Sequence, residues 1–177
     1  MNPNLASRAL LRHLRERFAI DWHGYHGAAH WARVRLNGLA LAGPTGANAH
    51  VVELSSFFHD ACRVNEGRDA GHGQRGGELA RALRGTYFEA SDEEMELLVL
   101  ACDGHSGGGI DADITVQDCW DADRLDLARV GTMPKAKYLC TEQARQQQVI
   151  DQAVQRSREW LAGRRRGGSG AGASSRR

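Results

Sequence analysis

Four side chains on apolar segments have the chemistry of metal ligands. His59 and Asp60 directly follow the apolar run 51–58, and His30 and Asp123 lie on two further apolar segments. A buried aspartate at the end of an apolar helix is costly unless a cation neutralises it. Two imidazoles and two carboxylates suit Mn, Fe, Co, Ni or Zn better than Ca, and they leave coordination positions for water or substrate. We therefore expect one divalent transition-metal ion and leave a second one open.

The order of these residues resembles the H…HD…D signature of the HD superfamily of metal-dependent phosphohydrolases. Residues 26–34, HGAAHWARV, are similar to the first-histidine helix of that family, and residues 122–125, ADRL, resemble its final segment. The resemblance covers roughly residues 20–135, and the chain resembles the small stand-alone HD domain proteins of bacteria.

The resemblance assigns the metal to His30, His59, Asp60 and Asp123. Asp121 is the competing choice for the last ligand. Residues two apart on a helix point about 200° apart, so both aspartates cannot face one ion. We prefer Asp123 because it stands in the ADRL position.

His72 and His105 stand where some members of the family bind a second metal ion. Those members often carry adjacent histidines at the later position, whereas here Gly104 precedes His105. We count Asp60, His72 and His105 as catalytic residues, and phosphate binding or proton transfer are the other roles open to the two histidines.

The resemblance implies hydrolysis of a nucleotide or other small phosphate ester by metal-activated water. Guanidinium groups bind phosphate oxygens two at a time. The expected substrate-binding residues are the following ones near the motifs: His26, Arg33, Arg63, Arg75 and Arg124. Two other functions stay open. One is a di-iron oxygenase like the myo-inositol oxygenase branch of the superfamily, and the other is a non-catalytic ligand-binding or regulatory domain that has kept its metal.

Helical periodicity dominates the chain, and we find no apolar–polar alternation long enough for a strand. We expect an all-α fold, a compact HD-domain helical bundle of about six or seven helices. After a first helix around Leu10 and Leu14, the predicted helices cover residues 28–42, 48–64, 71–85, 91–102, 118–130 and 141–161. Gly43-Pro44 is expected to end the second helix.

The composition is typical of one globular domain, because the 177 residues are 41% hydrophobic and 25% charged. We assign residues 1–162 to this metal-binding domain and residues 163–177, built from Gly, Ser, Ala and Arg, to a disordered tail. The tail carries five arginines and no acid, so the rest of the chain has a net charge of −4. We expect no nucleic-acid partner beyond a weak contact through this tail.

Two absences in the sequence bear on location. Every apolar run is shorter than the ~20 residues that cross a bilayer, and the four cysteines form no CxxC pair. We therefore expect a cytoplasmic protein with buried free thiols and no membrane partner. The partner that the resemblance implies is a small phosphorylated substrate such as a nucleotide. Homodimer formation is left open.

Overall fold

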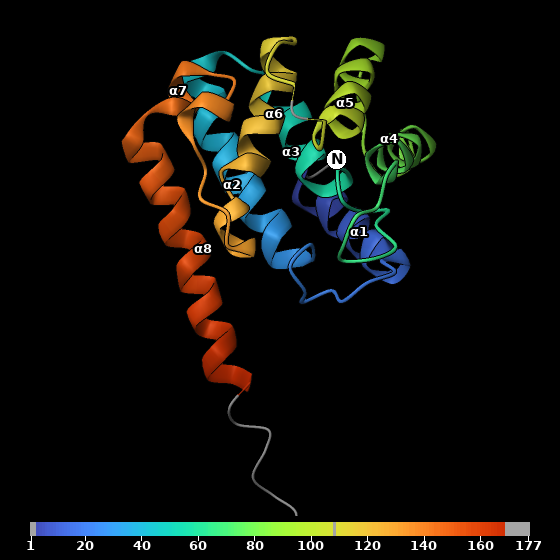
Figure 1. The fold of residues 1–177 in the computed structure, drawn as a ribbon. Coiled ribbons are helices and arrows are strands. Elements are labelled where there is room, and N and C mark those ends of the chain that lie inside the picture. The colour runs from blue at the N-terminus through green and yellow to red at the C-terminus, as the bar shows by residue number, and fades with distance from the viewer. Residues whose placement is uncertain (1–2, 108, 169–177) are drawn as a thin grey trace, which may run out of the picture.

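The structure is a computed structural model that describes residues 3–107 and 109–168. Over these residues it contains eight α-helices, two short 3-10 helices and no strand (Figure 1). The elements are α1 (Pro3–Arg17), α2 (Ala28–Thr45), α3 (Ala49–Phe58), α4 (His72–Leu83), α5 (Asp92–Gly104), α6 (Ile114–Arg124), η1 (Leu127–Val130), η2 (Ala136–Tyr138), α7 (Glu142–Arg145) and α8 (Gln147–Gly168). The predicted all-α class is confirmed, and the four-residue α7 brings the number of α-helices above the expected range.

The end of α2 differs from the sequence prediction. The helix continues through Pro44 to Thr45 and ends at Gly46, whose φ of 79° is left-handed and whose N–H donates to the carbonyl oxygen of Ala42. Pro44 has no backbone N–H and so removes one intrahelical hydrogen bond, but the helix continues for only one residue beyond it. Gly46, rather than Gly43-Pro44, therefore terminates the helix.

Three other helices have different limits from those predicted. α3 stops at Phe58, and His59 and Asp60 lie in the turn that follows. α6 begins after the N-cap Asp113, whose side chain accepts a hydrogen bond from the backbone N–H of Thr115. The last predicted helix is divided at Gln146, whose extended ψ of 130° separates α7 from α8.

Two clusters of buried apolar side chains form the core. The larger one contains Leu14 of α1, Trp31 of α2 and Phe58 of α3. The smaller one contains Leu125 and Ile150, where α8 packs against α2 and η1. Figure 1 shows α8 lying along one side of the bundle and extending beyond it.

Two glycines let α4 approach its neighbours very closely. A Cβ atom on Gly73 would lie 2.0 Å from the carbonyl oxygen of Cys102 in α5, and one on Gly76 would lie 2.2 Å from the carbonyl oxygen of Phe58 in α3. Only a residue without a side chain fits at such a distance. The beginning of α4 is therefore held against the ends of both α3 and α5.

The last helix runs past the boundary that we expected at residue 162. α8 continues to Gly168, and the guanidinium of Arg164 lies 5.1 Å from the ring centroid of Trp160 and 5.5 Å from that of Tyr25. Arg164 also donates a hydrogen bond to the carbonyl oxygen of His23. These contacts tie the first turn of the predicted tail to the loop before α2, while residues 169–177 lie outside the described residues.

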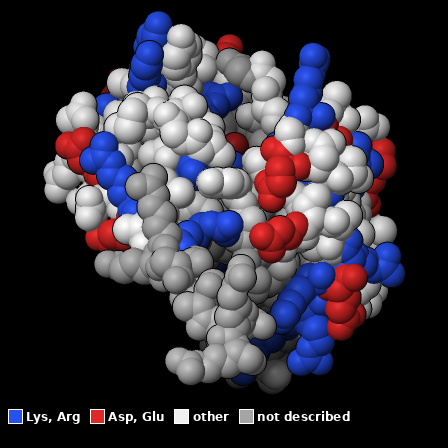
Figure 2. Space-filling model, turned by 60° about the horizontal axis from the view of Figure 1, so that its bottom comes forward, with Lys and Arg blue, Asp and Glu red and all other residues white. Residues whose placement is uncertain are grey.

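No helix in the described part of the chain combines the length and the apolar character needed to span a bilayer. Figure 2 shows one face of the protein, on which Lys and Arg side chains are interspersed with Asp and Glu side chains.

Candidate metal centre

Five buried histidine and aspartate side chains meet where α2, α3, α4 and α5 come together. They are His30, His59, Asp60, His72 and His105, each no more than 7% exposed. They form two groups of potential metal ligands that share Asp60. These residues could hold a metal ion.

The first group joins α2 to the end of α3. The Nε2 atoms of His30 and His59 lie 3.0 Å apart, and His30 Nε2 lies 3.3 Å from Asp60 Oδ2. Asp123 Oδ1 of α6 lies 3.4 Å from His30 Nε2. The four residues predicted for the first metal ion therefore lie together.

The second group uses the other oxygen of the same carboxylate. Asp60 Oδ1 lies 3.2 Å from His72 Nε2 and 3.7 Å from His105 Nε2. The two Nε2 atoms are 2.9 Å apart. One carboxylate thus faces a pair of histidines with each of its oxygens.

The outer nitrogen of each imidazole is held by an acceptor. The Nδ1 atoms of His59, His72 and His105 donate to backbone carbonyl oxygens at 3.0, 2.5 and 2.6 Å, those of residues 55, 69 and 102 respectively. A carbonyl oxygen can only accept, so each Nδ1 carries the hydrogen and each neutral ring presents a lone pair at Nε2. Two lone pairs repel each other at about 3 Å, so each pair of facing nitrogens needs a proton or a metal ion between them.

Asp126 orients His30, and the sequence analysis did not identify it. Its Oδ2 accepts from His30 Nδ1 at 2.7 Å, and its Oδ1 accepts from Arg33 Nε at 2.6 Å and from Ser157 Oγ at 2.7 Å. Burial alone would raise the pKa of Asp126, but the hydrogen bonds from His30 and Arg33 lower it far below its usual range. The spacing of three residues from Asp123, which places both on one side of a helical turn, was the available signal.

The two candidate aspartates of α6 have different surroundings. Asp121 accepts hydrogen bonds from the backbone N–H groups of Cys140 (2.6 Å) and Thr141 (2.8 Å) and from the Thr141 hydroxyl (2.9 Å). It therefore holds the chain at the start of α7. Asp123 lies beside His30, and its Oδ1 has no hydrogen-bond partner among the described residues.

The carboxylates of the cluster stay ionised. Burial alone would raise the pKa of Asp60, but the electrostatic interaction with His59 and hydrogen bonds from His105 and His30 lower it well below its usual range. Burial would likewise raise the pKa of Asp123, but the Arg129 guanidinium lowers it. Two anionic oxygen ligands are therefore available at neutral pH.

A polar cavity of about 320 Å³, here called the metal pocket, opens over Asp60 and Asp123. Its lining residues are His26, Asp60, Arg63, His105, Ser106, Asp123, Arg124, Leu127, Arg129 and Val130. Three of the five predicted substrate-binding residues, His26, Arg63 and Arg124, are among them. Arg129, whose Nη1 lies 3.8 Å from Asp123 Oδ1, was missed because it follows the motifs rather than standing within them.

Arg33 and Arg75, the other two predicted substrate-binding residues, are not among those that line the metal pocket. Arg33 is 7% exposed and binds Asp126, and its guanidinium lies 4.5 Å from the ring centroid of Trp160. Arg75 donates to Asp69 (2.8 Å) and to the carbonyl oxygen of Cys62 (3.0 Å). Both guanidinium groups bind acceptors of the protein itself, Arg33 in a buried position and Arg75 in a half-buried one.

The glycine before His105 has a packing reason. A Cβ atom on Gly104 would lie 2.4 Å from the Trp120 ring. The indole N–H of Trp120 donates to the carbonyl oxygen of Ala101, which fixes the ring against α5. No side chain fits at position 104, and His105 alone reaches the cluster from this helix.

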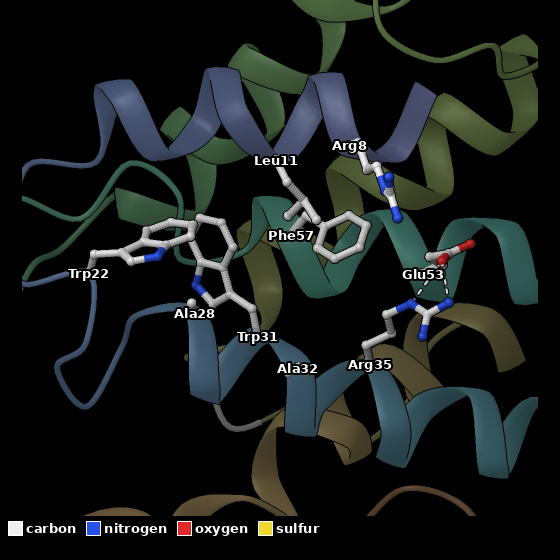
Figure 3. Close-up of a pocket in the computed structure, with 9 residues that line it drawn as sticks. All are labelled: Arg8, Leu11, Trp22, Ala28, Trp31, Ala32, Arg35, Glu53 and Phe57. Carbon is white, nitrogen blue, oxygen red and sulfur yellow. Dashed lines mark hydrogen bonds and ion pairs between the residues drawn. The ribbon is translucent and has the colours of Figure 1, made fainter. Parts of the chain in front are cut away.

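Two further cavities lie in the described part of the protein. One, of about 280 Å³, shares Arg124 and Leu127 with the metal pocket. The other, of about 370 Å³, lies between α1, α2 and α3 and has none of the metal pocket's lining residues among its own (Figure 3). Figure 3 shows Trp22 and Trp31 at one end of it and the Arg35–Glu53 ion pair at the other.

No family model, no curated protein and no solved structure matches this chain. The feature that points to a function is therefore the cluster itself, a buried set of histidines and aspartates that could bind a metal ion.

Proposed function

We propose that this protein is a metal-dependent phosphohydrolase of the HD type, acting on a small phosphate ester with two metal ions bound. The observation that carries the proposal is the pair of facing Nε2 contacts, at 3.0 and 2.9 Å, on the two sides of Asp60. Carbonyl acceptors hold the outer nitrogens of three of these rings, an arrangement typical of metal-ligating histidines. Asp126 does the same for His30.

The two ions would have different ligand sets. His30, His59, Asp123 and Asp60 Oδ2 would hold the first, and His72, His105 and Asp60 Oδ1 would hold the second. Sets that combine imidazole nitrogens with carboxylate oxygens suit Mn, Fe, Co, Ni or Zn. When bound, such ions lower the pKa of a coordinated water toward neutrality and polarise a phosphoryl oxygen.

Arginine side chains would bind the phosphate. Arg63, Arg124 and Arg129 line the metal pocket. Arg63 Nε lies 2.7 Å from Asp60 Oδ1, so a guanidinium stands at the shared carboxylate itself. Planar guanidinium groups match phosphate oxygens in pairs, and their charge balances the charge that develops during hydrolysis.

His26 would supply the proton to the leaving group. Its Nδ1 is hydrogen-bonded to the Glu66 carboxylate, which leaves Nε2 for the substrate, and its side chain lines the metal pocket without belonging to either ligand group. Burial lowers the pKa of His26, while the charge of Asp60 and the hydrogen bond to Glu66 oppose this effect. As the oxygen of a water molecule forms its bond to phosphorus and the ester P–O bond breaks, the doubly protonated ring of His26 would give the proton on Nε2 to the departing oxygen and keep the one on Nδ1 bonded to Glu66.

The proposal is tested by metal analysis and phosphate release on the purified full chain with manganese added. We expect about two equivalents of metal per chain and turnover of a phosphate ester, both strongly reduced in Asp60→Asn. His50→Ala is the matched control, because His50 lies on α3 but is exposed and bonds to the carbonyl oxygen of Glu89. Metal content and turnover in Asp60→Asn equal to those of the control would contradict the proposal.

A di-iron oxygenase is the second candidate, favoured by the same shared carboxylate. A di-iron enzyme needs ligands for two ions, and the two ligand groups that share Asp60 offer them. The arginines of the metal pocket favour a phosphate substrate instead. Oxygen consumption by the iron-loaded protein with myo-inositol, without phosphate release from any ester, would select the oxygenase. Bound metal with neither activity would select a ligand-binding domain.

A further inference from the structure

We propose that the apolar cavity beside the metal pocket binds the organic group of the substrate and selects phosphate monoesters of a flat aromatic ring. This inference rests on the proposed phosphohydrolase function and goes beyond it by naming the substrate class. The cavity, here called the apolar pocket, has a volume of about 280 Å³. Its lining is mostly apolar, from Leu127, Met133, Pro134, Tyr138 and Leu139, and its polar lining residues are Arg124, Thr132 and Lys135.

The two cavities share a wall. Arg124 and Leu127 line both the metal pocket and the apolar pocket. A phosphate bound near Asp60 and Asp123 would therefore have the apolar pocket next to it. A single small ester could occupy both cavities, with its charged end among arginines and its organic end among apolar side chains.

Large apolar side chains are exposed at this place. Met133 is 47% exposed, Tyr138 is 57% exposed, and Val130 on the rim of the metal pocket is 45% exposed. Exposed apolar patches beside a polar cavity are typical of ligand-binding sites. Leu127, Met133 and Pro134 offer apolar contacts to a ring, and Tyr138 offers a ring that can pack against another aromatic ring.

The apolar pocket is fixed relative to the metal ligands. The guanidinium of Arg124 donates to the carbonyl oxygens of Tyr138 (3.0 Å) and Gly109 (2.6 Å). Asp121 of the same helix accepts from the backbone N–H groups of Cys140 and Thr141. The segment that carries Met133 and Tyr138 is thus attached at its far end to α6, the helix that carries Asp123.

The lining favours one kind of organic group. A sugar or glycerol moiety would leave its hydroxyl groups against apolar walls, where each unpaired polar group is unfavourable. A flat ring would fill the space and exclude water from the apolar side chains. We therefore expect aryl phosphates to be hydrolysed in preference to sugar phosphates, glycerol phosphate and nucleoside monophosphates, in which a ribose carries the phosphate.

Steady-state kinetics of the manganese-loaded full chain tests the inference. We expect kcat/KM for 1-naphthyl phosphate to exceed that for glycerol phosphate by at least about tenfold. Met133→Gln should reduce this ratio severalfold. Leu100→Ala is the control, because Leu100 is similarly exposed (58%) but lies on α5 outside both pockets. A nucleoside monophosphate, whose ribose separates the phosphate from the ring, should have a lower kcat/KM than 1-naphthyl phosphate, and a higher one would overturn the preference for an aryl ester.

Binding of 1-naphthol, which has no phosphate, separates this inference from the proposed function. We expect the full chain to bind naphthol and Met133→Gln to bind it more weakly, measured by naphthol fluorescence. Naphthol binding without hydrolysis of any ester would overturn the phosphohydrolase and retain the pocket. Equal kcat/KM for naphthyl, nucleoside and glycerol phosphates, with no naphthol binding, would overturn the inference and retain the phosphohydrolase.

Discussion

Asp118 of α6 is a fully buried carboxyl group whose ionisation should control stability across neutral pH. Its side chain is 0% exposed, and neither oxygen has a hydrogen-bond partner among the described residues. The neighbouring Thr45 hydroxyl donates instead to the carbonyl oxygen of Leu41 (2.9 Å). Burial and the nearby charge of Asp121 raise the pKa of Asp118 from 3.8 to about 8.

The direction of the effect follows from the raised pKa. In the unfolded chain the carboxyl group loses its proton near its ordinary pKa of 3.8, whereas in the folded protein it keeps the proton to about pH 8. The stability due to the protonated form is fully present below pH 3.8 and is lost as the pH rises through about 8. Because each pH unit in this interval corresponds to about 1.4 kcal/mol, the group should reduce the free energy of unfolding by about 3 kcal/mol between pH 5 and 7.

Asp118→Asn removes the titrating group and keeps its shape. We expect the variant to lose this pH dependence and to be more stable than the wild type at pH 7 to 8. Urea unfolding followed by circular dichroism at pH 5, 6, 7 and 8 measures the difference. Asp111→Asn, which changes an exposed carboxylate, is the control. Parallel curves for the wild type and Asp118→Asn would refute the assignment of a raised pKa.

Three other predictions concern the cluster and its supports. Asp126→Asn should weaken metal binding about 10- to 100-fold, because the carboxylate that orients His30 is lost. Competition with a chelator measures the metal affinity, and an unchanged affinity would show that Asp126 does not support metal binding. Gly76→Ala should destabilise the protein by about 1–3 kcal/mol through overpacking, while Gly163→Ala, where a Cβ meets nothing within 4 Å, should not lower the melting temperature. His26→Gln should slow hydrolysis of an alkyl phosphate by about 10²–10⁴ and that of nitrophenyl phosphate much less, since a good leaving group needs no proton; equal losses would exclude proton donation.

The sequence contained enough to predict the fold class and the residues that meet in the first ligand group. Helical periodicity is a local property, and it identified the α-helices that carry His30 and Asp123. The residues at which these helices begin and end depend on tertiary contacts, which no local sequence pattern contains. Gly46 ends α2 in place of Gly43-Pro44, and Asp113 starts α6 earlier than its apolar residues suggest.

The roles of the arginines could not be predicted from their position beside a motif. Arg33 binds Asp126 and Arg75 binds Asp69 outside the metal pocket, whereas Arg129 lines the metal pocket and also donates to the carbonyl oxygens of Tyr25 and Asp126. An arginine that binds an internal carboxylate and one that faces a ligand have the same local sequence signal, and only the folded chain distinguishes them. The departure at Gly104 is likewise a matter of packing, since the ring of Trp120 occupies the space beside it.

An anomalous difference map from a crystal soaked in manganese tests directly whether two metal ions bind on the two sides of Asp60. We predict two peaks within about 4 Å of each other, one beside Asp60 Oδ2 with His30 and His59 and one beside Asp60 Oδ1 with His72 and His105. A map in which one or both ligand groups lack a peak, or in which manganese binds only elsewhere on the protein, would contradict a site for two metal ions.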